Sequence, residues 1–212
     1  MTRLGILLSG RGSNFLAIAD AIDRGAIANA EISIVISNRK EAAAIAAAEA
    51  RGLATRVIEA CGRKRVEQDA ETIACLREHG VQLVCLAGYM RLLSAEFVAA
   101  FPNAILNIHP SLLPAFPGLD AQCQALQHGV HISGCTVHFV DEQLDHGVIV
   151  VQRAVPVLEG DDQTMLSARI LEQEHLAYPE AIARVVSGKY RIAGRKYVAC
   201  ALQDEPEAKE TK

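Results

Sequence analysis

Asn107 and His109 are the residues of this sequence whose types and spacing best suit catalysis. They lie two positions apart at the end of an apolar segment, so on a β-strand both side chains point to the same face. An amide donates hydrogen bonds, and an imidazole donates or moves a proton near neutral pH. A carboxylate such as Asp145, if the fold brings it to His109, would hold the imidazole and favour its cationic form. This set suits attack by a neutral nucleophile on a carbonyl, in which an oxyanion is stabilised and a proton is relocated.

The sequence offers no covalent nucleophile beside this pair. Ser111 lies close to His109, but the chain contains no G-x-S-x-G segment, which argues against a serine hydrolase. The six cysteines form no C-x-x-C pair, and the other histidines lack metal-ligand spacing. We therefore expect neither a disulfide framework nor a metal site.

A glycine-containing motif, Ser9-Gly-Arg-Gly-Ser-Asn14, follows the first apolar segment. Its glycines allow a tight turn and present backbone amides to an anion at a helix N-terminus. Phe15 stands where a dinucleotide fingerprint would need its third glycine. The second apolar segment ends at Ser37-Asn38, without the acid that binds an adenosine ribose. The motif indicates a site for a single phosphate rather than a dinucleotide; the alternative is a plain strand-to-helix turn.

Alternating strands and helices must position these residues. Apolar segments predict strands over Leu4–Leu8, Glu31–Ile36, Thr55–Ile58, Gln82–Leu86 and Ala104–Ile108, and helical spacing predicts helices over Asn14–Arg24, Glu41–Arg51, Arg65–His79 and Ala95–Phe101. This alternation predicts an α/β fold with an open, mostly parallel, twisted sheet and helices on both faces. Asn107 and His109 then fall at the carboxyl end of a strand, where such sheets bind ligands.

The second half of the chain has a different pattern. A proline-rich loop precedes a short helix over Gln122–His128, and the longer strands Ser133–Val140 and Val148–Val157 predict an antiparallel addition. Thr164–Val186 predicts one long helix, with a bend near Pro179, and Tyr190–Cys200 a terminal hairpin.

Length and charge restrict the class of protein. The chain of 212 residues is long enough for one domain, and its net charge of −4 with dispersed basic residues argues against a nucleic-acid partner. No segment approaches the ~20 apolar residues of a membrane span, and the first apolar run is too short for a signal peptide. We expect a cytoplasmic protein with no membrane partner.

Several segments, in their order along the chain, resemble the phosphoribosylglycinamide formyltransferase family, which consists of folate-dependent enzymes of purine synthesis. They are Ser9–Asn14, Leu86-Ala-Gly-Tyr-Met-Arg-Leu-Leu-Ser94, Leu106-Asn-Ile-His-Pro-Ser-Leu-Leu-Pro114, Gly134-Cys-Thr-Val-His-Phe-Val140, Leu144-Asp-His-Gly147, Val155-Pro-Val157 and Glu174-His175. The segment around Asn107 and His109 is specific to enzymes that transfer formyl groups from folate, and the glycine loop favours the glycinamide enzyme. The resemblance covers almost the whole chain up to about Ser187.

The resemblance implies a Rossmann-like formyltransferase fold and a role for each matched residue. His109 would be the general acid, Asn107 the oxyanion donor, and Asp145 the partner that makes His109 more basic. The resemblance also implies a phosphate and ribose site and a folate pocket. Gly12, Ser13 and Asn14 would hold the substrate phosphate and Glu174 the ribose hydroxyls, while Arg65, Met90, Arg91, Leu92, Leu93, Asn107, Asp141, Glu142, Gln143, Leu144 and Asp145 would line the folate pocket.

These roles imply 10-formyltetrahydrofolate as co-substrate, glycinamide ribonucleotide as acceptor, no metal, and a monomer or homodimer. We expect residues 1–188 to form the formyltransferase domain, with a phosphate-binding half (1–103) and a catalytic and folate-binding half (104–188). A terminal hairpin (189–202) and a disordered tail (203–212) would follow. The sequence departs from the family at Asp120 and Gln122, where histidines are common, and from Tyr190 onward it offers no match.

Two other functions stay open at this point. A formyltetrahydrofolate hydrolase (deformylase) would use the same three residues with water as the nucleophile, but such enzymes usually carry an extra regulatory domain for which this chain has no room. A non-catalytic nucleotide-binding module would use the sheet only for binding, and the missing third glycine argues against it. Formylation of methionyl-tRNA would need a tRNA-binding extension, and the acidic tail has the wrong charge for one.

Overall fold

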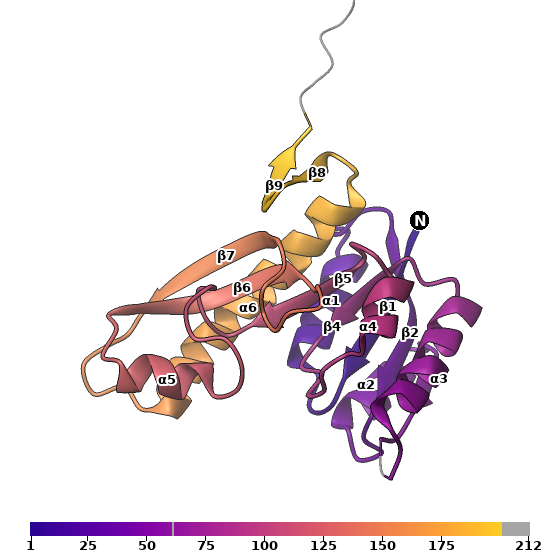
Figure 1. The fold of residues 1–212 in the computed structure, drawn as a ribbon, viewed down its shortest axis with the longest axis horizontal. Helices are drawn as coiled ribbons and strands as arrows, with labels where there is room; N and C mark the ends of the chain where they lie inside the picture. Colours follow the sequence, from indigo (N-terminus) through magenta and orange to yellow (C-terminus); the bar gives the residue numbers. More distant parts are fainter. Residues whose placement is uncertain (61, 201–212) are drawn as a thin grey trace, which may run out of the picture.

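Nine strands form a single mixed sheet in the part of the chain that the structure describes (Figure 1). The computed structural model describes residues 1–60 and 62–200. In chain order the elements are β1 (Thr2–Leu8), α1 (Ser13–Asp23), β2 (Ala30–Ser37), α2 (Ala43–Ala50), β3 (Thr55–Val57), α3 (Arg65–Glu78), β4 (Leu83–Leu86), α4 (Ala95–Ala100), β5 (Ile105–His109), α5 (Ala121–Gln127), β6 (Ile132–Phe139), β7 (Ile149–Pro156), α6 (Gln163–Val186), β8 (Tyr190–Ala193) and β9 (Lys196–Ala199).

The sheet changes from parallel to antiparallel at β5, the strand that carries Asn107 and His109. Its order is β3-β2-β1-β4-β5-β6-β7-β9-β8, and the pairs from β3 to β5 are all parallel. β6 is antiparallel to β5, and β7 is antiparallel to β6. The chain builds outward from β1 to β3 and then returns to place β4 on the other side of β1. The carboxyl ends of β1 and β4 therefore form the switch point at which open α/β sheets bind ligands.

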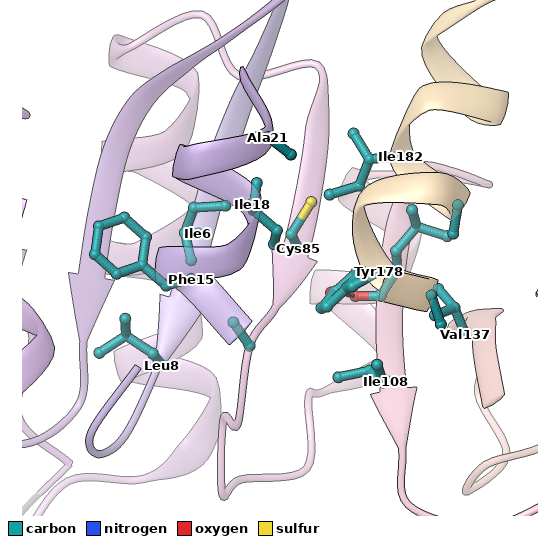
Figure 2. Close-up of a cluster of buried hydrophobic side chains, with 14 of the residues drawn as sticks. Ile6, Leu8, Phe15, Ile18, Ala21, Cys85, Ile108, Val137, Tyr178 and Ile182 are labelled. Carbon is teal, nitrogen blue, oxygen red and sulfur yellow. Dashed lines mark hydrogen bonds between the residues drawn. The ribbon is translucent and has the colours of Figure 1, made fainter. Parts of the chain in front are cut away.

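Helices cover both faces of the sheet. α1, α2, α5 and α6 pack on one face, around a core that contains Phe15 and Tyr178, and Figure 2 shows part of this core. α3 and α4 pack on the other face, where Leu76 and Phe97 are fully buried. Alternate residues of β4 (83–86) belong to the two cores because successive side chains of a strand point to opposite faces. Helices therefore cover both faces of the sheet, and a ligand can reach the sheet at the ends of its strands.

Tyr178 fixes the long helix α6 to the middle of the sheet. Its buried hydroxyl lies 3.1 Å from the carbonyl oxygen of Leu86 and 2.9 Å from that of Leu106, so its hydrogen is shared between β4 and β5. Glu174 lies four residues earlier on α6 and therefore on the same side of the helix. Packing of Tyr178 thus brings Glu174 toward the sheet.

The predicted fold class is confirmed, including the antiparallel strands of the second half. The helix predicted over Glu41–Arg51 begins only at Ala43, because Ala42 is extended (φ −64°, ψ 111°) and provides no side-chain cap. α6 continues through Pro179 as one helix. β8 and β9 pair as an antiparallel hairpin, while residues 201–202 and the predicted tail, 203–212, lie outside the described residues. Within the described residues, no helix is both long and apolar enough to cross a membrane.

Candidate active site

Asn107 and His109 project from the last residues of β5, as the two-residue spacing predicts. His109 is buried, whereas Asn107 is partly exposed. In the antiparallel ladder with β6, Asn107 lies opposite His138 and His109 lies opposite Thr136. Directly opposed residues of an antiparallel pair have side chains on the same face. The pairing therefore adds β6 side chains to those of β5.

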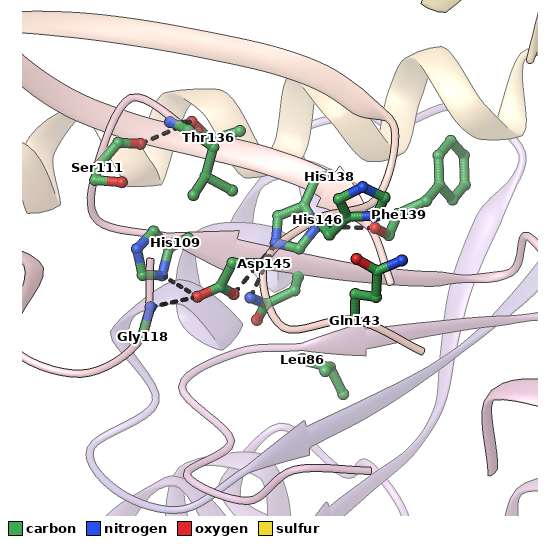
Figure 3. A network of polar contacts seen from close by, with 12 residues as sticks. Leu86, His109, Ser111, Gly118, Thr136, His138, Phe139, Gln143, Asp145 and His146 are labelled. Carbon is green, nitrogen blue, oxygen red and sulfur yellow. Dashed lines mark hydrogen bonds and ion pairs between the residues drawn. The ribbon is translucent and has the colours of Figure 1, made fainter. Parts of the chain in front are cut away.

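Asp145 reaches this pair from the loop between β6 and β7, as Figure 3 shows. Its Oδ2 lies 3.4 Å from His109 Nδ1 and accepts a 2.8 Å hydrogen bond from the backbone N–H of Gly118. Its Oδ1 lies 3.7 Å from Nε2 of His138. The Asp145 side chain is only 8% exposed. The structure therefore brings together the amide, imidazole and carboxylate predicted from the sequence.

Both ring nitrogens of His109 face oxygen acceptors. Nε2 donates to the carbonyl oxygen of Phe116 at 2.8 Å, and Nδ1 faces the Asp145 carboxylate. A neutral ring carries only one N–H, whereas an imidazolium carries two. The arrangement therefore suits the imidazolium form of His109, whose charge Asp145 balances.

His138 is a residue of the site that the sequence analysis did not assign. Its Nδ1–H donates to the carbonyl oxygen of Phe139 at 2.8 Å, and its Nε2 lies 3.3 Å from Nδ2 of Asn107. Burial lowers the pKa of His138, and the nearby charge of Asp145 offsets only part of this effect. A neutral ring protonated at Nδ1 leaves Nε2 as an acceptor for the Asn107 amide. His138 thus fixes the orientation of Asn107 and leaves the second amide hydrogen for another acceptor.

The glycine motif forms the turn between β1 and α1. Gly12 is the N-cap of α1 with φ 76°, and a Cβ there would collide with Ala44, so the position needs glycine. Ser13 and Asn14 begin the helix. The Asn14 Nδ2 donates a 2.7 Å hydrogen bond to Oε2 of Glu174 on α6, and burial raises the pKa of this carboxyl group. The structure therefore joins two of the four residues predicted to bind the phosphate and ribose.

Exposed apolar side chains lie in the loops that follow β4 and β6, the two strands on either side of β5. Met90 and Leu92, after β4, and Leu144, beside Asp145, are each more than half exposed. The structure also places the remaining predicted folate residues: Arg91 and Leu93 lie in the same loop after β4, Asp141, Glu142 and Gln143 lie in the loop after β6, and Arg65 is the exposed first residue of α3. Among the described residues, no hydrogen bond or ion pair joins Arg65 to the others.

The loop that carries Asp145 is held by several local contacts. Asp145 has a left-handed backbone (φ 49°), which aspartate tolerates better than most residues. A Cβ at Gly147 would collide with the carbonyl of Phe139, so the loop packs closely against β6. His146 Nδ1 lies 2.8 Å from Asp141 Oδ2, and Arg195 of the terminal hairpin donates to the His146 carbonyl at 2.6 Å.

An amide, an imidazole and a carboxylate that meet at the strand ends of an α/β sheet are typical of the class of enzymes that act on carbonyl groups. Comparisons with known proteins agree with this class. The family described as Formyl transferase matches residues 2–182. The trifunctional purine biosynthetic protein adenosine-3 of Homo sapiens is 44% identical over 204 residues, which are 96% of this chain and 20% of that protein.

Two further relatives match over most of both chains. The phosphoribosylglycinamide formyltransferase of Escherichia coli (strain K12) is 39% identical over 188 residues, 88% of each chain. The crystal structure of glycinamide ribonucleotide transformylase 1 from Symbiobacterium toebii superposes with a TM-score of 0.91 and 48% identity over 94% of both chains. This chain belongs to the formyl transferase family. It spans about a fifth of the length of the human trifunctional relative.

Proposed function

We propose that this chain transfers the formyl group of 10-formyltetrahydrofolate to the amine of 5-phosphoribosylglycinamide in purine biosynthesis. The observation that carries the proposal is the convergence of Asn107, His109 and Asp145 in one cluster at the end of β5, where Asp145 lies next to His109 and, through His138, to Asn107. Membership of the formyl transferase family supports the choice of a formyl group. The relatives that match along most of their length support the choice of acceptor.

The reaction is a direct attack by the neutral amine on the formyl carbon. A bond forms between the amine nitrogen and the formyl carbon while the formyl oxygen takes up negative charge. An amine of this type has a pKa of about 8, so a useful fraction is unprotonated at neutral pH without a strong base. When the intermediate collapses, the bond from the formyl carbon to N10 of the folate breaks. Overall, one proton leaves the amine and one reaches N10.

Asn107 and His109 stabilise the oxyanion of this intermediate. The Asn107 amide offers the hydrogen that His138 does not use, and the imidazolium of His109 offers a charged donor. The formyl oxygen competes with the Phe116 carbonyl for the hydrogen on Nε2. As the intermediate collapses, His109 gives its proton to N10, and the proton released by the amine restores the imidazolium. Asp145 holds the ring in place throughout and balances its charge whenever the ring is protonated.

The glycine loop and α6 bind the acceptor substrate. Gly12, Ser13 and Asn14 form the N-terminal turn of α1, whose free backbone amides suit a phosphate. Glu174 is a buried carboxylate with Asn14 as a neutral donor. The two ribose hydroxyls supply further donors, which a buried carboxylate needs. This explains a carboxylate in a place where burial alone disfavours its charge.

The rim of the cluster binds the folate. Met90, Leu92 and Leu144 expose apolar surface in the loops after β4 and β6, and these side chains can cover the apolar parts of the folate. Because β4 and β6 flank β5 and Leu144 precedes Asp145, a folate bound to these loops would present its formyl group to the reacting residues. The remaining predicted pocket residues lie in the same two loops and at the start of α3.

A transfer assay with the purified full chain and both substrates tests the proposal. We expect formylated product and tetrahydrofolate in equal amounts, and a loss of at least ~100-fold for His109→Ala. His131→Ala is the matched control, because His131 is exposed on the surface before β6. Formate release without the amine substrate would instead indicate a deformylase, and binding of NAD without any turnover a nucleotide-binding module. We also predict a cytoplasmic monomer or homodimer with small-molecule partners only.

A further inference from the structure

The loop between β4 and α4, residues 88–94, is irregular and carries two of the exposed apolar residues of the rim, Met90 and Leu92. An irregular loop holds its shape only where other groups bind its backbone. In this structure a buried side chain binds the loop near each of its two ends. Neither side chain belongs to the loop itself.

Ser9 holds the beginning of the loop. This residue is 4% exposed and lies directly after β1. Its Oγ accepts a 2.9 Å hydrogen bond from the backbone N–H of Met90 and donates a 2.6 Å hydrogen bond to Oδ1 of Asn38. Its own backbone N–H donates to the carbonyl of Gly88 at 3.1 Å. The hydroxyl group is therefore used as both donor and acceptor, which fixes its direction.

Asp69 holds the end of the loop. This aspartate of α3 is 2% exposed, and its Oδ2 accepts a 2.7 Å hydrogen bond from the backbone N–H of Ser94. Ser94 is in turn the N-cap of α4, where its Oγ accepts from the N–H of Phe97. Burial, with a smaller contribution from the charge of Asp69, raises the pKa of Tyr89 in this loop to about 12.

Ser9 also connects two parts of the site. It immediately precedes Gly10, so the same residue binds the loop at the rim and begins the glycine turn that leads to α1. A shift of its hydroxyl would move the start of loop 88–94 relative to the glycine turn. Asp69 has no such connection, because its hydrogen bond to the loop, among the described residues, is the one from Ser94 at the far end.

We propose that Ser9 and Asp69 are positioning residues for the folate co-substrate, because they fix the backbone of residues 90–93 against the edge of a planar heterocycle. This inference rests on the proposed function. Such an edge presents several donors and acceptors in one plane, so its recognition requires backbone N–H and C=O groups at set positions. Neither residue belongs to the cluster of Asn107, His109 and Asp145, and the side chains of both act on the folate through the loop.

Steady-state kinetics of Ser9→Ala, Asp69→Leu and Asp69→Asn, with each substrate varied in turn, test the inference. We expect the KM for the folate to rise ~3- to 10-fold in Ser9→Ala and ~10- to 100-fold in Asp69→Leu, since a charged acceptor is worth more than a neutral one. Asp69→Asn keeps an acceptor oxygen but loses the charge, so its folate KM should rise only ~3- to 10-fold, less than in Asp69→Leu. The KM for the amine substrate and kcat should change less than about threefold in all three variants.

Ser133→Ala is the matched control, because Ser133 is buried and its Oγ has no partner among the described residues. Unchanged folate KM in Ser9→Ala, or equal rises for both substrates, would overturn the inference. Ser9→Ala decides the matter if Asp69→Leu does not fold. A wild type that transfers no formyl group refutes the proposed function instead, and the inference is then judged from tetrahydrofolate binding by calorimetry. Equal affinity of the wild type and Ser9→Ala, or no binding to the wild type, overturns it.

Discussion

Replacement of His138 by phenylalanine tests whether this histidine orients the oxyanion donor. The side chain is 2% exposed, and phenylalanine keeps a planar ring in its place. The change removes the Nε2 acceptor that lies 3.3 Å from Nδ2 of Asn107, and also the Nδ1–H that donates to the carbonyl of Phe139. The Asn107 amide remains but loses the contact that holds it.

The size of the effect follows from what is lost. Removal of an oxyanion donor, as in Asn107→Ala, typically costs ~10²–10³ in turnover. His138→Phe removes only the contact that orients the donor, a neutral hydrogen bond worth about 0.5–1.5 kcal/mol. At about 1.4 kcal/mol per factor of ten, this corresponds to a ~2- to 12-fold fall in the rate of transfer. The unpaired carbonyl of Phe139 should lower the free energy of unfolding by about 1–3 kcal/mol.

Single-turnover rates of formyl transfer measure this effect apart from product release. If His138 acts through Asn107, the double variant Asn107→Ala/His138→Phe should be no slower than Asn107→Ala alone, within about twofold. His138→Gln, whose amide oxygen offers an acceptor at the end of the side chain, should recover part of the loss. Rates of the two single variants that multiply fully in the double variant would refute the reasoning.

Three further predictions concern the carboxylates and the loop after β6. Asp145→Asn should fold normally, as judged by its thermal midpoint, and lose at least ~10-fold in turnover, because a neutral amide does not balance the imidazolium; unchanged turnover would remove Asp145 from the mechanism. Burial raises the pKa of Glu174, so the folded protein loses stability as the pH rises from the unfolded value through the folded pKa. Glu174→Gln should therefore raise the thermal midpoint at neutral pH while it weakens binding of the amine substrate, and an unchanged midpoint would contradict this. Arg195→Ala should lower turnover by ~2- to 5-fold, since two exposed contacts to His146 are lost and such contacts are weak; no change would show that the hairpin does not hold the loop.

The fold could be predicted from the sequence because its elements are set locally. Each parallel strand is a short apolar run followed by a helical pattern, and the alternation alone indicates an α/β sheet. The ends of elements depend on caps that the apolar pattern does not contain. The helix over Ala43–Ala50 starts two residues later than its alanine-rich pattern suggests, because the chain has no side chain there to cap an earlier start.

Only the part of the site that depends on local sequence could be predicted. Asn107 and His109 share a strand, so their common direction follows from the two-residue spacing. Asp145 lies 36 residues after His109, and only the resemblance to a family, not the local pattern, placed it at the imidazole. His138 was missed because its role depends on the register between β5 and β6, which is a property of the folded sheet. The available signal was that His138 and Thr136 lie two residues apart on one predicted strand, as Asn107 and His109 do on another, so both pairs place their side chains on one face.

The antiparallel pairing of β6 with β5 is the step that creates the site. Opposed residues in such a pair have Cβ atoms about 4.5–5.5 Å apart, so His138 reaches Asn107 directly. A slip of one residue would turn His138 to the opposite face of the sheet and bring an apolar neighbour opposite Asn107. A register shift against β7 falls between Val137 and His138, at the point where the following loop must fold back over β5. Bulges of this kind commonly redirect a chain beside an active site. The irregularity, the glycine at 147 and the left-handed Asp145 together return the carboxylate to His109, so the site depends on β6 as much as on β5.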